Sequence, residues 1–294
     1  MNIRNNKYLP FIIITILSLI WGSTWVAIKI GLEDLPPFLS AGWRFLLASL
    51  FLFAFAVKKK LPFPKDLRSH LFLIFFSVIN FSASYALVYW GEQYINSGLT
   101  SVLFSVMPFY TALISIKVLP SEQINIKKMA GITVGFLGVI IIFSDQLYFT
   151  HPLSIYGMIA VLISPAFSAW GTLLGKKARS SYHAITLNTL PIFYTGLTFM
   201  LIHFLFERGA VFEYTLSGVL SMAYLGIMGT AFAFALYFWL LKSVSAVMMS
   251  LITYITPPLA LLWGWIIFDE AISLKLIIGM CVIFSGIAIV RRWK

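Results

Sequence analysis

Ten stretches of nearly uncharged, apolar sequence follow one another between Leu9 and Val290. Most are about 20 residues long, the length that a helix needs to cross the hydrocarbon core of a bilayer. Unbroken apolar runs favour helices over membrane β-strands, which are short and alternate in polarity. We therefore expect an all-α polytopic membrane protein with ten transmembrane helices, over Leu9–Ile28, Pro37–Val57, Leu71–Trp90, Gly98–Ile116, Met129–Phe143, Ile155–Gly175, Ala184–Phe206, Ser217–Leu241, Val244–Phe268 and Leu276–Val290.

Composition excludes a water-soluble globule. The chain is 60% hydrophobic and only 11% charged, whereas soluble domains are about 25% charged. The first span follows Arg4 and Lys7 but is too long for a secretory signal and lacks a small-x-small cleavage pattern, so we expect it to stay attached. The single cysteine, Cys281, lies in an apolar span, so neither a disulfide framework nor a cysteine-based metal site is expected.

The basic residues predict the orientation in the membrane, because cytoplasmic loops retain Lys and Arg. If the N-terminus is cytoplasmic, 17 of the 21 basic residues fall in cytoplasmic segments and eight of the ten acidic residues fall on the outer side. We therefore expect both termini in the cytoplasm and the protein in the inner (cytoplasmic) membrane. This asymmetry also accounts for the net charge of +11, so nucleic acid is not expected as a partner.

The second half of the chain repeats the first at a separation of about 149 residues. Trp21-Gly22-Ser23 recurs as Trp170-Gly171-Thr172, and the segment from Tyr85 to Trp90 recurs from Phe234 to Trp239. Further on, Glu122, Ile124, Lys127, Gly131 and Gly138 correspond to Glu270, Ile272, Lys275, Gly279 and Gly286. We expect two repeats, residues 1–148 and 149–294.

Each repeat holds five spans, an odd number, so the second copy enters the membrane from the opposite side. Such an inverted-topology repeat lets two similar halves exchange conformations, which gives alternating access to a site between them.

The order and spacing of these motifs resemble the drug/metabolite transporter superfamily, specifically its ten-helix EamA-type branch. The resemblance rests on Trp21-Gly22-Ser23 with Lys29, on Arg44, on the Pro108 helix with Glu122, and on the Thr256-Pro257-Pro258 helix with Glu270. It implies two five-helix repeats, a central cavity lined mainly by the first, third, fourth, sixth, eighth and ninth helices, and export of amino acids, related metabolites or drugs.

Polar and aromatic side chains near mid-span are the candidate substrate pathway, because unsatisfied polar groups are costly in hydrocarbon. Local bonding of Ser and Thr to their own helix is the competing explanation. Trp21 and Trp170 occupy matching positions away from the interfacial belt and are candidate cavity walls. The full candidate set is Trp21, Ser23, Arg44, Asn80, Ser84, Tyr85, Ser105, Pro108, Ser164, Ser168, Trp170, Thr230, Tyr237, Tyr254 and Pro257.

Arg44 is the one formal charge well inside a span. It could clamp a substrate carboxylate, or it could pair with Glu33, Asp34 or Glu92 and fix the second helix. No acidic residue falls within the spans as drawn, so we expect facilitated transport, or coupling through a peripheral acid such as Glu92. Pro108 and the Pro257-Pro258 pair interrupt the fourth and ninth spans, which points to a binding site there.

These patterns predict a secondary transporter that moves small amino-acid-like, aromatic or amphipathic metabolites outwards through a central cavity. A sugar-phosphate or nucleotide-sugar exchanger of the same superfamily is the alternative, and an integral-membrane scaffold or enzyme is less favoured. The spans supply serines but no mid-membrane His, Asp or Glu to activate them, so we expect no catalytic residue, no metal and no cofactor. Gly131-x-x-x-Gly135 and Gly279/Gly286 predict close helix contacts, and only weakly a homodimer face.

Overall fold

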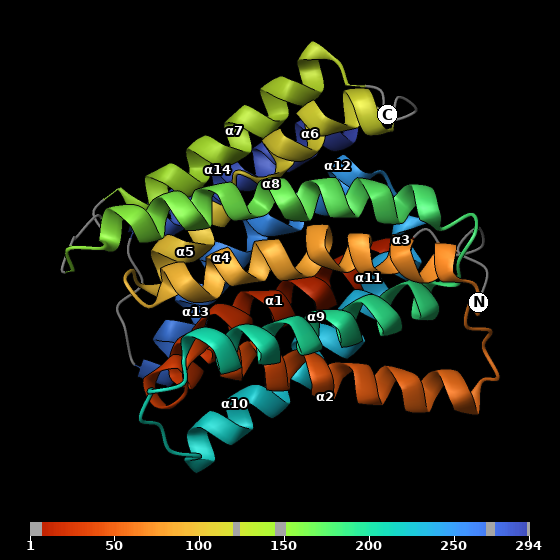
Figure 1. Ribbon diagram of the computed structural model, residues 1–294. Helices are drawn as coiled ribbons and strands as arrows, with labels where there is room; N and C mark the ends of the chain where they lie inside the picture. The colour runs from red at the N-terminus through yellow and green to blue at the C-terminus, as the bar shows by residue number, and fades with distance from the viewer. Residues whose placement is uncertain (1–7, 120–123, 145–150, 269–273, 293–294) are drawn as a thin grey trace.

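The computed structural model describes residues 8–119, 124–144, 151–268 and 274–292. Within these ranges the chain forms helices and no strand (Figure 1). Glu122, Glu270 and the basic residues Arg4, Lys7 and Lys294 lie outside the described residues. The elements are α1 (Leu9–Asp34), α2 (Pro37–Lys58), α3 (Leu67–Ser77), η2 (Val78–Ser82), α4 (Ala83–Glu92), α5 (Ser97–Phe104), α6 (Met107–Val118), α7 (Ile126–Phe143), α8 (Ser154–Ala178), α9 (Ala184–Phe206), α10 (Leu216–Gly226), η3 (Ile227–Phe232), α11 (Ala233–Leu241), α12 (Ala246–Ser250), α13 (Ile252–Phe268) and α14 (Leu274–Arg292).

Several of the ten expected spans are built from more than one element. α3, η2 and α4 form a continuous span over Leu67–Glu92, α5 and α6 form Ser97–Val118, and α10, η3 and α11 form Leu216–Leu241. In all, seven helical spans in the described chain are long and apolar enough to cross a membrane, and two shorter apolar helices cover Ala246–Ala260 and Ile277–Val290. With α7, these account for the ten predicted spans.

The two repeats run in opposite directions. In Figure 1, α1 runs from right to left and α8, its counterpart in the second repeat, runs from left to right. α1 begins and α14 ends on the same side of the bundle, as an even number of spans requires. The prediction of an all-α membrane protein with inverted repeats is confirmed.

Side-chain caps fix where several spans begin. Asp66 accepts a 2.8 Å hydrogen bond from the backbone N–H of Ser69 at the start of α3, and this bond lowers the pKa of Asp66. Asn96 accepts a 2.7 Å bond from the N–H of Leu99 at the start of α5. Such caps satisfy N–H groups that have no partner within a helix.

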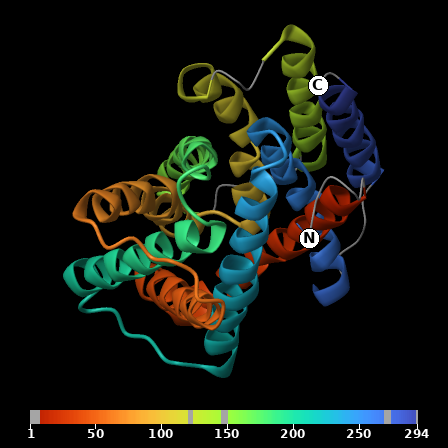
Figure 2. The ribbon, with the colours of Figure 1, turned by 90° about the vertical axis from the view of Figure 1, so that its right-hand side faces the viewer.

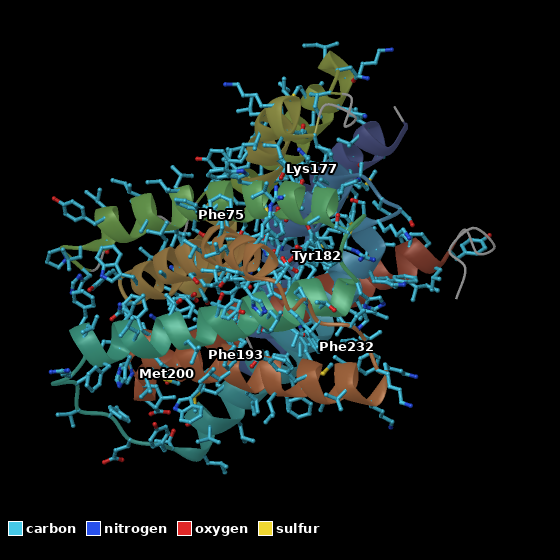
Figure 3. All side chains as sticks on the ribbon, turned by 45° about the vertical axis from the view of Figure 1, so that its right-hand side comes forward. Phe75, Lys177, Tyr182, Phe193, Met200 and Phe232 are labelled. Atoms are coloured by element: carbon cyan, nitrogen blue, oxygen red, sulfur yellow. The ribbon has the colours of Figure 1, made fainter. Side chains whose placement is uncertain are left out.

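Two helix pairs close the edges of the bundle. α2 lies along α9, where Met200 of α9 packs against Gly42 of α2 (Figure 3). α7 lies along α14, at one edge in Figure 2. A Cβ at Gly131 would lie 2.9 Å from the carbonyl oxygen of Gly286, so these helices approach closely only because they carry glycine. The glycine patterns predicted as helix contacts therefore join α7 and α14 of one chain.

Candidate functional site

A central cavity lies among α1, α2, η2, α4 and the helices of both repeats that face them. The space inside it that water-sized groups can occupy is about 80 Å³, and its empty volume is about 770 Å³ when the open solvent at its mouth is included. Seven of the fifteen candidate residues line it, namely Trp21, Arg44, Asn80, Ser84, Tyr85, Ser168 and Tyr237. Thr24, Trp25, Ile28, Val88, Phe104, Met107, Thr172, Phe234, Met249, Ser250, Ile252, Thr253 and Thr256 complete the lining.

Two π-helical segments stand at matching positions in the two repeats. η2 begins at Val78 and η3 begins at Ile227, which are 149 positions apart, the same offset as the sequence repeat. A π turn holds one residue more than an α turn, and such turns are frequent at functional sites. Asn80 of η2 lines the cavity and Thr230 of η3 contacts Arg44. Hydrophobic periodicity did not predict these π-helical segments.

Each π segment contacts a tryptophan-glycine motif of the opposite repeat. The indole N–H of Trp21 donates a 3.1 Å hydrogen bond to the carbonyl oxygen of Gly229 in η3. In the other repeat, Gly171 lies against Asn80 of η2, where an added Cβ would stand 2.5 Å from the Asn80 Cα. The recurring Trp-Gly pairs therefore position the two π segments on either side of the cavity.

Arg44 is almost completely buried, at 1% exposure, and is held by groups from three elements. Its Nε donates a 2.8 Å hydrogen bond to Thr230, and Nη1 donates a 3.2 Å bond to the hydroxyl of Tyr89. The ring centroids of Tyr85 and Phe45 lie 4.8 and 5.5 Å from the guanidinium carbon. The guanidinium is thus fixed in place at the cavity wall by hydrogen bonds and cation–π contacts.

Serine hydroxyls join α4 to α8 beside the cavity. Ser84 lies 2.7 Å from the hydroxyl of Ser168 and 3.1 Å from that of Ser164. Ser84 and Ser168 line the cavity, whereas Ser164 is fully buried behind them. The hydroxyls predicted at comparable depth therefore meet one another, and two of the three face the open space.

Aromatic rings form another part of the wall. The Trp21 ring lies 5.4 Å from Phe234 and 5.3 Å from Tyr237, measured between centroids. Tyr237 also exchanges a 3.3 Å hydrogen bond with Thr172, on the helix that begins the second repeat. A flat or apolar ligand group can stack against such a surface.

An apolar cluster packs at the wall of the cavity, toward the end of the bundle where α1 and α4 finish. The rings of Trp25 and Phe104 are tilted by 58° to each other with centroids 5.4 Å apart, and Val88 and Ala260 pack against them. We call these four residues the outer plug, because the distribution of basic residues predicts that this end of the bundle faces away from the cytoplasm. The Trp25 side chain is 8% exposed, and its indole N–H has no hydrogen-bond partner among the described residues. Sequence reasoning missed Trp25 and Phe104, although Trp25 lies one turn beyond Trp21.

Several candidate residues lie away from the lining and bond to the protein instead. Ser23 contacts the hydroxyl of Tyr224, and Tyr254 donates a 2.8 Å hydrogen bond to the carbonyl of Ile132. Trp170 is 37% exposed and packs edge-on against Phe75, which lies on α3 (Figure 3). Trp170 is therefore not placed as the mirror of Trp21, because its ring turns to the outside of the bundle.

The prolines lie beside the helix breaks and do not line the cavity. The first break falls at Ser105 and Val106, before Pro108, which occupies the first turn of α6. The second falls at Leu251, six positions before Pro257, which is inside α13. The expectation that Pro257 and Pro258 themselves interrupt the ninth span is corrected, since the helix continues through both.

Glu92 departs from the expectation that no acidic residue falls within a span. α4 continues to Glu92, two residues beyond the predicted end at Trp90, and the carboxyl group is completely buried. The ammonium group of Lys29 donates a 3.3 Å hydrogen bond to the Glu92 backbone carbonyl. Neither carboxyl oxygen of Glu92 has a hydrogen-bond partner among the described residues.

Comparison with known proteins agrees with this architecture. Residues 9–144 and 155–292 each match the EamA-like transporter family. The chain is 31% identical to the uncharacterized transporter YoaV of Bacillus subtilis, over 92% of both chains, and 30% identical to protein PagO of Salmonella typhimurium, over 89% of this chain and 86% of PagO. A crystal structure with 18% sequence identity superposes with a TM-score of 0.80, covering 98% of this chain and all of the other, and supports the fold alone.

The bundle of membrane helices, with a cavity between two inverted halves, has the architecture of a membrane transporter. The chain belongs to the EamA-like transporter family.

Proposed function

We propose that this protein is a secondary transporter that exports small metabolites, either amino acids or aromatic and amphipathic compounds. The substrate binds in the central cavity between residues 1–148 and residues 149–294, and alternating access of these halves carries it across the membrane. The observation that carries the proposal is the fixed guanidinium of Arg44 in a cavity walled by aromatic rings and hydroxyls.

Arg44 selects for an anionic group on the substrate. A guanidinium has five N–H donors, and the bonds to Thr230 and Tyr89 use two of them. Tyr85 also contacts the guanidinium, so the donors for a substrate carboxylate are those that face the cavity, where an arginine can bind a carboxylate bidentately. Among the described residues that line the cavity Arg44 is the only charged one, so no acid in the lining itself competes with a ligand carboxylate.

The rest of the cavity suits an apolar or aromatic substrate body with a few hydrogen-bonding groups. Trp21, Phe234 and Tyr237 offer ring faces and edges. Asn80 and Ser168 offer amide and hydroxyl groups that can bind a substrate amine or hydroxyl. An amino acid or an aromatic carboxylate matches both parts of this surface.

Alternating access follows from the inverted repeat. The π segments and helix breaks recur in both halves and supply points at which each half can bend. We place the protein in the inner membrane with both termini in the cytoplasm, on the distribution of basic residues. A relative from Escherichia coli, 27% identical over 95% of this chain and 89% of its own length, bears the name uncharacterized inner membrane transporter YedA.

A thermal-shift screen of the purified protein tests this proposal. Amino acids, aromatic carboxylates and sugar phosphates are compared, because a ligand present at 100 times its Kd stabilises the folded state by about 2.7 kcal/mol. We expect stabilisation by a carboxylate ligand, loss of that shift in Arg44→Gln, and efflux of the ligand from proteoliposomes. Stabilisation by sugar phosphates alone would favour the exchanger, and indifference to every compound would contradict a transport site.

A further inference from the structure

Glu92 is a buried ionisable residue that takes no part in the proposed substrate site. Its side chain is completely buried, yet it does not line the cavity. Both carboxyl oxygens lack hydrogen-bond partners among the described residues. Burying an ionised carboxylate without such partners is costly, and the group then depends on nearby charges or takes up a proton.

Two cations on two other helices interact with this carboxyl group. Lys29, near the end of α1, reaches the backbone carbonyl of Glu92 at 3.3 Å, and Arg44 of α2 acts on the carboxylate through its charge. On its own helix, Glu92 faces the hydroxyl of Tyr89. From α8, Gly157 and Val161 pack against Gly91 and bring no charge. His151 stands behind Tyr94, with ring centroids 4.9 Å apart.

The position of Glu92 connects this charge cluster to the outer plug. Val88 of the plug lies one helical turn before Glu92 on α4, and Trp25 lies one turn before Lys29 on α1. An ionised Glu92 therefore attracts the ends of α1 and α2 to the end of α4 and holds the plug together. A neutral Glu92 loses that attraction, and Lys29 and Arg44 then repel each other at the same place.

The residues beside Glu92 reach water although its own side chain does not. Lys29 is only half-buried, and Gln93, the next residue along the chain, is exposed.

We propose that Glu92 is a proton-binding site linked to the opening of the outer end of the cavity. A proton from the outer aqueous phase binds a carboxyl oxygen of Glu92, the attraction to Lys29 and Arg44 is lost, and the outer plug opens. Deprotonation restores the attraction and closes it. This linkage rests on the proposed alternating access, and it identifies the proton as the coupled ion.

Cysteine accessibility tests the linkage without knowledge of the substrate. The single native thiol is removed by Cys281→Ser, and Thr24→Cys places a thiol in the cavity inside the plug, at a residue whose hydroxyl bonds its own helix. A small, charged methanethiosulfonate reagent is added from the outside over a range of pH. Rates are divided by those of Val211→Cys, which is 99% exposed in the loop after α9, to correct for thiol ionisation.

We expect the corrected rate to rise at least about fivefold from pH ~8.5 to ~5.5, in line with typical coupling free energies. Glu92→Gln, which is always neutral, should give the fast rate at every pH, and Glu92→Asp should retain a pH dependence. Glu213→Gln, which neutralises an exposed acid on the same side, should behave as the parent protein.

A corrected rate that is independent of pH in the parent protein would overturn the proposal. The same pH dependence in Glu92→Gln, with its loss in His151→Gln, would assign the titration to His151 and also overturn it. If Glu92→Gln does not yield folded protein, the midpoint of the pH profile in Glu92→Asp decides, because an unchanged midpoint contradicts a role for this carboxyl group. A ligand that protects the Thr24→Cys thiol while pH has no effect would leave the transport function intact and remove only the linkage.

Discussion

The hydroxyl of Ser105 lies 2.8 Å from the carbonyl oxygen of Thr253 and 2.8 Å from that of Ser101 in its own helix, so its one proton is shared between the two acceptors. Thr253 lies four positions before Pro257. In an α-helix the N–H of residue 257 would donate to the Thr253 carbonyl, but proline has no N–H. A side chain of the fourth span thus satisfies the carbonyl that proline frees in the ninth, its counterpart in the other repeat. Ser105 was predicted to line the pathway, but its observed contact joins the two halves beside the cavity.

Ser105→Ala should destabilise the protein by about 0.5–1.5 kcal/mol, the net value of one hydrogen bond, because the Thr253 carbonyl then keeps only the 3.3 Å bond from the Thr256 hydroxyl. Ser115→Ala is the matched control, since the buried Ser115 hydroxyl bonds only to Ala112 of its own helix. Unfolding in detergent measures both. Equal losses in the two variants would contradict a special role for the link between repeats.

Arg44→Lys should weaken ligand binding even though it preserves the charge. Lysine cannot reproduce the planar fork that contacts Thr230 and Tyr89 while facing the cavity. Loss of a hydrogen bond to a charged group is worth about 1.5–3 kcal/mol, or roughly 10- to 150-fold in Kd. Titration calorimetry with a ligand from the screen measures the change in Kd. Arg208→Gln, which removes an exposed arginine far along the chain from Arg44, serves as the control. Unchanged affinity in Arg44→Lys would exclude bidentate recognition.

Trp25→Phe and Trp21→Phe should have different consequences. Both variants lose the same ring volume, so both should lose some stability. The Trp25 indole N–H has no partner among the described residues, so Trp25→Phe should be destabilised less than Trp21→Phe, whose N–H bonds the Gly229 carbonyl. If the free Trp25 N–H bonds the ligand, Trp25→Phe should also lower ligand affinity by about 2- to 12-fold, the value of one hydrogen bond. Thermal melts with and without ligand separate the two effects, and equal loss of stability in the two variants together with unchanged ligand affinity in Trp25→Phe would contradict the assignment.

Gly171→Ala should destabilise the protein, because the new methyl group would overlap Asn80. Its Cβ would lie 2.2 Å from the Asn80 amide oxygen and 2.5 Å from the Asn80 Cα, so the helices must separate. Overpacking of this kind costs about 1–3 kcal/mol. Gly209→Ala, where no atom lies within 4 Å, is the control. Adding Asn80→Ala to Gly171→Ala should not restore stability, because the new methyl group still overlaps the Cα of residue 80. Full restoration in the double variant would show that only the Asn80 side chain causes the clash.

His183 should make stability depend on pH. Its Nδ1 accepts a 3.2 Å hydrogen bond from the N–H of Ile185 at the start of α9, and partial burial together with Arg179 lowers the pKa of His183 below its ordinary value of 6.5. The unfolded chain therefore binds the proton more readily, so this contribution is complete above pH 6.5 and is lost as pH falls toward the folded pKa. His183→Asn, which keeps a capping side chain, should flatten the profile of melting temperature against pH. An identical profile in both proteins would assign the effect elsewhere.

The sequence predicted those features that depend on hydrophobic length and on repetition. Apolar runs indicated the ten spans, and Trp21 and Trp170 indicated the repeat. The position of Arg44 well inside a span was also expected, because the span around it is otherwise uncharged. These signals are strong because the bilayer constrains every residue of a span in the same way.

Features that depend on helix rotation and helix ends were not predictable. Trp170 matches Trp21 in sequence but faces outward beside Phe75, because matched positions need not have matched neighbours. The outer plug joins four helices, and no local pattern relates Trp25 to Phe104. The burial of Glu92 was missed because hydropathy places the end of a span only to within a few residues.

The matching π segments make the cavity sensitive to the number of residues in the chain as well as to their identity. Each residue of an α-helix advances the rotation by about 100°, so one deleted residue in η2 would turn Tyr85, Val88 and Glu92 away from their present neighbours. A deletion in η3 would displace Tyr237 in the same manner. Single-residue deletions at these two points would thus rearrange the wall of the cavity while leaving every side chain that forms it in the sequence.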